Sequence, residues 1–245
     1  IGYSACGTGV LALGGAAPDG KYNVAIGTSA GDDLTTGSSN ILLGRNSGLN
    51  LTVGHDNIAI GHGALDAADT ATARNTNIAI GTSTLGSQTA AVTYCVAIGH
   101  QALKDQNADV TNTAIGGLAG STIDDGDYNT LVGFSAGRDI DDTDCNTVLG
   151  WSAFIRGTGT GNTVIGCAAG SSTNDSTTAM SGTDNVLVGN SAGYKLTDGP
   201  GNVLIGRSAG LAMTIGDYNT VIGYQAAAGI TGAADNNIAI GKHAL

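Results

Sequence analysis

Short apolar runs recur along the whole chain, each preceded by a polar residue and followed by glycine. The segment Asn23-Val24-Ala25-Ile26-Gly27-Thr28-Ser29-Ala30-Gly31 is one example. Its first glycine, here called the anchor glycine, returns at a nearly constant interval, with a few shorter or longer gaps. Self-similarity at a nearly fixed period is typical of repeat architectures. The anchors are Gly2, Gly27, Gly44, Gly61, Gly81, Gly99, Gly116, Gly133, Gly150, Gly166, Gly189, Gly206, Gly223 and Gly241.

Each position of the repeat has its own chemistry. Four residues before the anchor stands Asn in 12 of the 13 copies that reach back so far, and Cys95 is the exception. The position three before is Val, Ile or Thr, the position two before is Ala, Leu or Val, and the position one before is Ile, Val or Leu. The residue directly after the anchor is not constrained. A β-branched run bounded by Asn and Gly predicts a strand.

The rest of each unit predicts turns and a second, shorter strand. That strand is expected about seven residues after many anchors, at Leu34, Leu51, Ile123, Ile140, Leu196 and Met213. A turn signal such as Gly126-Asp127-Tyr128-Asn129 then closes the unit. Because a unit of this length cannot bury an apolar face alone, successive units must stack.

The sequence therefore predicts an all-β fold, a repetitive β-solenoid of the parallel β-roll or β-helix type. The period implies roughly 17 residues per coil. The array would hold 14 or 15 coils, the last number including a degenerate copy at Val10–Gly14. Residues 1–245 would form a single repeat array, an in-phase segment of a longer fibre.

Alternation along each strand sends successive side chains to opposite faces. We expect the positions three and one before the anchor to fill the coil, and the Ala, Leu or Val between them to point outward. Such an apolar stripe predicts an interface with another chain, most simply a homotrimer around a threefold axis. The alternative is a second apolar face covered by the chain's own loops.

The asparagine column predicts a ladder in which each side-chain amide bonds the next coil or its own turn. Its members are Asn23, Asn40, Asn57, Asn77, Asn112, Asn129, Asn146, Asn162, Asn185, Asn202, Asn219 and Asn237.

Composition narrows the classes of partner. The chain has 41 Gly but 2 Pro, which excludes collagen, and a formal net charge of −11, which disfavours nucleic acid. No apolar run approaches the roughly 18 residues of a membrane span, and no signal segment opens the chain.

These motifs resemble the repeats of two known families. Asn-Thr-Val-Ile-Gly-type motifs followed by Ser-Ala-Gly resemble the head repeats of trimeric autotransporter adhesins, whose period is shorter. The longer period, and phrases such as Asn219-Thr220-Val221-Ile222-Gly223-Tyr224-Gln225-Ala226, are more similar to repeats of bacteriophage tail-fibre and related virion proteins. The resemblance spans essentially the whole chain. It implies a parallel β-roll, trimers and a shaft or attachment role, and it carries over no catalytic residue.

Several motifs look like chemistry. Gly27–Gly31, Gly133–Gly137, Gly189–Gly193 and Gly206–Gly210 match the G-x-S-x-G elbow of hydrolases, but four in-phase copies indicate a repeat consensus. The four cysteines fall in different registers and are interpreted as small buried thiols. Phe134 and Trp151 could form a carbohydrate-stacking platform or pack against a loop.

The acidic turns give the one metal hypothesis. Asp124, Asp125 and Asp127 are followed one repeat later by Asp141, Asp142 and Asp144, with Asp139 close by. Oxygen ligands in this number suit Ca²⁺, the one cofactor that the sequence suggests. The alternative is a solvated acidic edge.

These features favour a stiff, non-enzymatic shaft or attachment segment of an extracellular fibre, most simply a phage tail fibre, located outside the cell or on the virion surface. The expected partner is the chain itself, as a homotrimer or an end-to-end filament. A bacterial adhesin that binds a host receptor or glycan is the first alternative. An ice-binding solenoid, suggested by Thr113, Thr130, Thr147 and Thr163, and a β-helical polysaccharide-degrading enzyme are others. The threonine column is expected to point inward, which counts against ice binding.

Overall fold

The computed structural model describes residues 21–66, 75–87, 92–107, 111–171, 179–232 and 234–245. The chain divides into two compact units, residues 1–125 and 126–245. The described residues form thirteen β-strands and no helix, so they contain no helix that could cross a membrane. The repeat copies expected at Gly2 and Val10–Gly14 lie outside the described residues.

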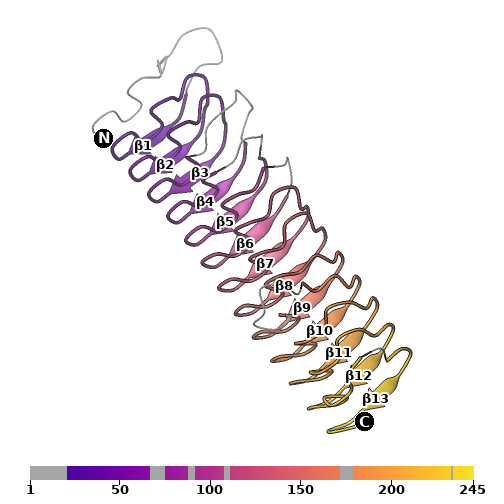
Figure 1. Cartoon of the computed structure of the whole chain (residues 1–245). Helices are drawn as coiled ribbons and strands as arrows, with labels where there is room; N and C mark the ends of the chain where they lie inside the picture. The colour runs from indigo at the N-terminus through magenta and orange to yellow at the C-terminus, as the bar shows by residue number, and fades with distance from the viewer. Residues whose placement is uncertain (1–20, 67–74, 88–91, 108–110, 172–178, 233) are drawn as a thin grey trace. The chain divides into compact units, whose positions relative to one another are not determined.

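Every described strand is three residues long and ends one residue before an anchor glycine. Figure 1 labels the strands in chain order. The first unit holds β1 (Val24–Ile26), β2 (Ile41–Leu43), β3 (Ile58–Ile60), β4 (Ile78–Ile80), β5 (Val96–Ile98) and β6 (Thr113–Ile115). The second unit holds β7 (Thr130–Val132), β8 (Thr147–Leu149), β9 (Thr163–Ile165), β10 (Val186–Val188), β11 (Val203–Ile205), β12 (Thr220–Ile222) and β13 (Ile238–Ile240).

Within each unit, every strand pairs in parallel with the next strand along the chain. Equivalent repeat positions face each other, as Val203 faces Thr220 in the pairing of β11 with β12. Longer repeats keep this register, because Ile58 still pairs with its equivalent Ile78 although an insertion separates their strands. The prediction of a parallel all-β solenoid with about 17 residues per turn is therefore confirmed.

The second strand expected in each coil is absent from the described residues. Leu34, Leu51, Ile123, Ile140, Leu196 and Met213 are buried, but they lie in turns or irregular backbone. Outside the thirteen strands, the described pairing consists of three isolated bridges, such as Gly157 with Met180. The physical reason is the backbone of the turns, where residues two and four after the anchor adopt left-handed φ, as Ser208 and Gly210 do at 56° and 59°. These angles curl the chain and interrupt extended structure.

The predicted direction of the strand side chains is wrong. In β2–β13 the central residue is buried, whereas its two neighbours are half-buried or exposed. The Ala, Leu or Val two before the anchor therefore fills the coil, and the Ile, Val, Leu and Thr positions face outward. Strict alternation gives the reason: the buried Asn four before the anchor shares a face with the position two before it.

In several coils the core takes one large side chain from either of two positions. In some of these the fourth residue after the anchor is Gly and the seventh is the large one, as in Gly137 with Ile140. A Cβ atom on Gly137 would lie 2.9 Å from Ile140 Cδ1. Where the fourth residue is large, the seventh changes instead: Phe154 is buried, and a Cβ on Gly157 would lie 2.0 Å from its ring. The two positions thus compete for one interior volume.

The asparagine column joins successive coils through its side-chain amides. Asn202 Oδ1 accepts hydrogen bonds from the backbone N–H and the Nδ2 of Asn219, both at 2.9 Å. Asn202 Nδ2 donates to Asn185 Oδ1 at 3.0 Å and to the Gly216 carbonyl at 2.7 Å. The same Asn-to-Asn amide pattern joins Asn23, Asn40, Asn57 and Asn77 in the first unit. At the one exception, the Cys95 backbone N–H still donates to Asn77 Oδ1 at 3.0 Å.

The first prediction concerns this amide ladder. Asn202→Ala removes a donor and an acceptor between buried groups, so we expect it to lower the free energy of unfolding by about 3 kcal/mol or more. Chemical denaturation followed by circular dichroism measures the change. Asn190→Ala, which alters an exposed asparagine, should cost roughly 0.5 kcal/mol or less. Equal costs for the two variants would contradict a stabilising ladder.

The second prediction separates backbone strain from steric clash at the anchor glycines. Gly206 and Gly241 have φ of 133° and 123°, a region that side chains rarely adopt. A Cβ on Gly206 would lie 2.4 Å from the Gly223 carbonyl oxygen, whereas a Cβ on Gly241 meets nothing within 4 Å. We expect Gly241→Ala to cost about 1–3 kcal/mol from strain alone, and Gly206→Ala to cost clearly more.

Gly229→Ala is the matched control, because a Cβ there meets nothing within 4 Å and its φ lies outside the left-handed region. Thermal unfolding of the three variants should rank Gly229→Ala as the mildest and Gly206→Ala as the most severe. A Gly206→Ala variant as stable as Gly241→Ala would show that the coils separate to accommodate a methyl group.

Candidate functional site

The outward positions of the strands form a continuous uncharged surface within each unit. We call the side chains three and one before the anchor, in β1–β13, the outer sheet face. All of them are Ile, Val, Leu or Thr. Val24 and Ile26 are each 47% exposed, and Leu149 is 46% exposed. A surface of this kind marks an interaction site more often than a solvated face.

The threonines of this face point outward, contrary to the sequence prediction. Thr130 and Thr147 are exposed and Thr163 is half-buried, and they stand opposite one another in β7, β8 and β9. Beyond them the column changes to Val186 and Val203. The array of hydroxyl groups is therefore short, which still counts against an ice-binding surface.

The six predicted calcium ligands lie in the turns before the strands. Asp124 and Asp125 belong to the first unit, and the other four belong to the second. Asp124 Oδ1 accepts a hydrogen bond from Asn107 Nδ2, and Asp144 Oδ1 accepts one from the Asp127 backbone N–H at 2.8 Å. Asp125, Asp141, Asp142 and Asp144 are exposed.

In these contacts the carboxylate oxygens of Asp124 and Asp144 accept hydrogen bonds from a side-chain amide and from a backbone N–H. Among the described residues, no group of three or more His, Cys, Asp or Glu side chains is arranged to hold a metal ion. Calcium binding by Asp124, Asp125, Asp127, Asp141, Asp142 and Asp144 stays a prediction.

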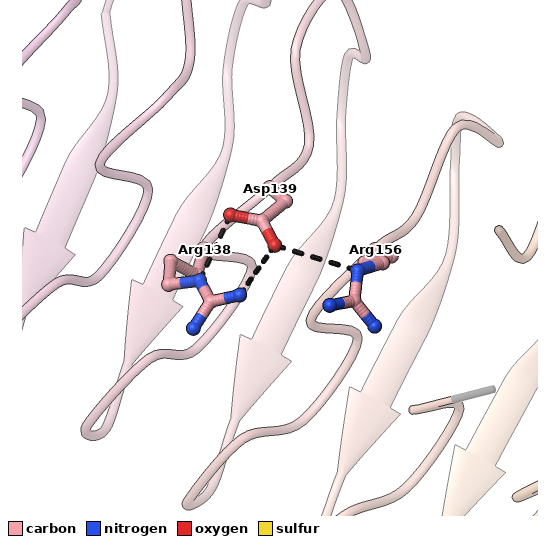
Figure 2. A network of polar contacts seen from close by, with 3 residues as sticks. All are labelled: Arg138, Asp139 and Arg156. Carbon is pink, nitrogen blue, oxygen red and sulfur yellow. Dashed lines mark hydrogen bonds and ion pairs between the residues drawn. The ribbon is translucent and has the colours of Figure 1, made fainter. Parts of the chain in front are cut away.

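Asp139, expected beside these carboxylates, is instead held by two arginines (Figure 2). Arg138 Nε and Nη2 donate to its two carboxylate oxygens at 2.8 and 2.6 Å, and Arg156 Nε lies 3.6 Å from Oδ2. The hydrogen bond to Asp139 raises the pKa of Arg138 above its ordinary value. Because the three side chains are partly solvated, this network contributes modestly to stability. It neutralises Asp139, which is thereby a poor ligand for a cation.

Two of the expected buried thiols are on the surface. Cys95 is buried, but Cys145 and Cys167 are exposed, and Cys6 lies outside the described residues. Phe134 and Trp151 are 52% and 58% exposed. The Ser152 backbone N–H donates to the Phe134 carbonyl, which sets the two aromatic residues in adjacent coils. A carbohydrate-stacking platform and packing against a loop both stay predictions for this pair.

Sequence reasoning also missed Asp66 in the first unit. Asn50 Nδ2 lies 2.7 Å from the Asp66 carbonyl and 3.5 Å from its Oδ1. Burial raises the pKa of Asp66 from 3.8 to about 6, and the charge of His62 opposes this shift. Nothing in the repeat distinguishes Asp66, because its position after the anchor is variable.

The third prediction follows from that shifted pKa. Between pH 3.8 and about 6, Asp66 is protonated in the folded chain and ionised in the unfolded chain. Its contribution to stability is therefore complete below the lower value and is lost as pH rises through the upper one. We expect Asp66→Asn to unfold at a higher temperature than the natural chain at about pH 8, and at a similar temperature at about pH 4.

Asp56→Asn serves as the control, because Asp56 is an exposed aspartate of the same unit. The difference in melting temperature between Asp56→Asn and the natural chain should not change between these two pH values. A constant difference for Asp66→Asn as well would exclude a shifted carboxyl at position 66.

Comparisons with protein-family models, with curated proteins and with solved structures gave no significant match to this chain.

Proposed function

We propose that this chain is a shaft or attachment segment of an extracellular fibre, most simply a phage tail fibre, and that it acts mechanically rather than as an enzyme. Its place would be outside the cell or on the virion surface. The observation that carries the proposal is a parallel sheet whose outer face is apolar or threonine throughout. All-parallel sheets in proteins almost always have both faces covered. The inner face is covered by the coil, and the outer sheet face is available to another chain.

A second copy is the partner that best fits this face. The side chains of the outer sheet face repeat once per coil, at roughly the 4.8 Å separation of paired strands. A second copy carries the same spacing, so its rows can lie between those of the first along the whole length of a unit. The apolar row expected to face outward, two before the anchor, was the wrong one. The same argument, from an exposed apolar row to a homotrimer, applies to the outer sheet face.

The backbone and amide ladders support a mechanical role. Around Asn202 the strand, the turn after the anchor and the asparagine side chain are all hydrogen-bonded to neighbouring coils. Local opening must break several of these bonds together, which makes such a unit resistant to proteolysis. The serines of the four G-x-S-x-G segments occupy one turn position, with φ of 54° to 56°. This regularity supports a scaffold role for them.

The fourth prediction tests self-association. In solution, light scattering coupled to size-exclusion chromatography should give a mass of three times the 24.0 kDa chain. Ile205 and Ile222 face each other on the outer sheet face. Because buried carboxylates at an apolar interface are strongly unfavourable, the double variant Ile205→Glu/Ile222→Glu should run as a monomer with an unchanged circular dichroism spectrum.

Lys195→Glu alters an exposed charge away from the strands and should leave the mass of the assembly unchanged. A natural chain that runs as a 24.0 kDa monomer at micromolar concentration would overturn the proposed self-association. The mass measurement also separates a closed trimer from an open filament, because only the filament grows with concentration.

A further inference from the structure

The residues directly after the anchor glycines have an unusual composition, and we call this repeat position the corner row. Its fourteen members are Tyr3, Thr28, Arg45, His62, Thr82, His100, Gly117, Phe134, Trp151, Cys167, Asn190, Arg207, Tyr224 and Lys242. Nine of them are basic, histidine or aromatic, although the whole chain of 245 residues holds 9 Lys or Arg, 4 His and 10 aromatic residues. None is acidic, although the chain has 20 Asp and Glu. The position that looked unconstrained in the sequence is therefore selective in charge.

Hydrogen bonds between coils hold the corner row in line. Within each unit, the backbone N–H of the residue two after an anchor donates to the carbonyl of the corner-row residue in the preceding coil. In the second unit, Gln225 N donates to Arg207 O at 2.9 Å, and His243 N donates to Tyr224 O at 3.0 Å. Side chains of neighbouring coils consequently leave the backbone side by side. Arg207, Tyr224 and Lys242 are exposed.

Three of these side chains and His243 form one cluster in the second unit. Arg207 Cζ and Lys242 Nζ each lie 5.9 Å from the centre of the Tyr224 ring. The His243 ring meets the Tyr224 ring edge to face, with centres 5.5 Å apart. Two cations thus share one aromatic ring.

The cluster contains no carboxylate. The ion pairs formed among the described residues join Lys104 to Asp105, and Arg138 and Arg156 to Asp139. In a chain of net charge −11, Arg207 and Lys242 are set against an aromatic ring instead of an acid. An exposed cation–π contact is weak, about 0.5–1 kcal/mol, so the Tyr224 ring leaves most of the positive charge of Arg207 and Lys242 uncompensated. An anion is the natural complement of this arrangement.

From this geometry we propose that Arg207, Tyr224, Lys242 and His243 bind an acidic saccharide, a sugar that carries carboxylate or sulfate groups. The cations bind the acidic groups through charge-assisted hydrogen bonds, and the Tyr224 ring packs against the C–H face of the sugar. A polysaccharide can extend along the row, where Asn190 presents an exposed amide one coil before Arg207. Nucleic acid is negatively charged, as an acidic saccharide is. The acidic residues in the rest of the chain, however, repel a phosphate backbone that extends along the whole unit. This binding property goes beyond the proposed shaft and does not require self-association.

Isothermal titration tests the proposal on the whole chain. The probes are a hyaluronan oligosaccharide, which carries carboxylates, and a heparin-derived oligosaccharide, which carries sulfates. A neutral maltooligosaccharide of similar length and a DNA duplex of similar charge are the comparison ligands. We expect at least one acidic oligosaccharide to bind, the neutral sugar not to bind, and the affinity to fall as salt is raised.

Three variants locate the site. Arg207→Gln/Lys242→Gln and Tyr224→Leu should each weaken binding of the acidic oligosaccharide roughly tenfold or more, because each removes a direct contact. Lys195→Gln removes an exposed lysine elsewhere in the same unit and should change affinity less than about twofold. Unchanged melting temperatures would show that the variants are folded.

Three results would overturn the proposal. They are no binding of either acidic oligosaccharide at millimolar concentration, equal binding by the natural chain and Arg207→Gln/Lys242→Gln, and DNA binding tighter than that of both acidic oligosaccharides. The proposed shaft is tested separately by the solution mass, so either proposal can fail while the other stands.

Discussion

The buried asparagine amide is the interaction on which the coil depends. An amide placed inside a stack of coils must satisfy two donor hydrogens and an acceptor oxygen, because an unpaired polar group in the interior costs about 1–3 kcal/mol. Asn202 meets this requirement with the amide of the coil before, the amide of the coil after and a backbone carbonyl. Equal positions in successive coils supply two of these three partners. The amide therefore fixes the register of stacking, and every other position of the repeat inherits it.

Once that register is fixed, the small interior volume of the coil limits which side chains can follow the strand. In the coil around Gly133, the inward Leu131 of the strand, Ala136 and Ile140 fill the interior. Gly137 with Ile140, and Phe154 with Gly157, are two solutions to the same volume. Because a large residue can come from either position, the repeats differ in sequence after the strand although their backbones follow the same path.

The sequence was sufficient to predict the repeat, the strand before each anchor glycine and the parallel stacking, because these depend on spacing alone. The orientation of the strand was missed because β-branched residues were assigned to the interior by hydrophobicity. The asparagine column held the correction, since a buried Asn40 places Leu42 inside by alternation. The prediction of a second strand was wrong for another reason: Leu34 and Ile140 are buried, but left-handed turns leave them outside any ladder. The pKa of Asp66 depends on burial at one coil, which no pattern of repeats contains.

Stacking in register also makes each surface position into a line of side chains, so a small bias in one register becomes a continuous chemical feature. The outer sheet face is such a feature, uncharged in every described strand. The corner row is another, without acidic residues in a chain of net charge −11. Acidic residues instead gather in the turns before the strands, where Asp141, Asp142 and Asp144 are exposed. An apolar face, an acidic edge and a basic, aromatic corner thus occupy separate registers of the repeat, so the self-association and the saccharide binding that we propose use different side chains.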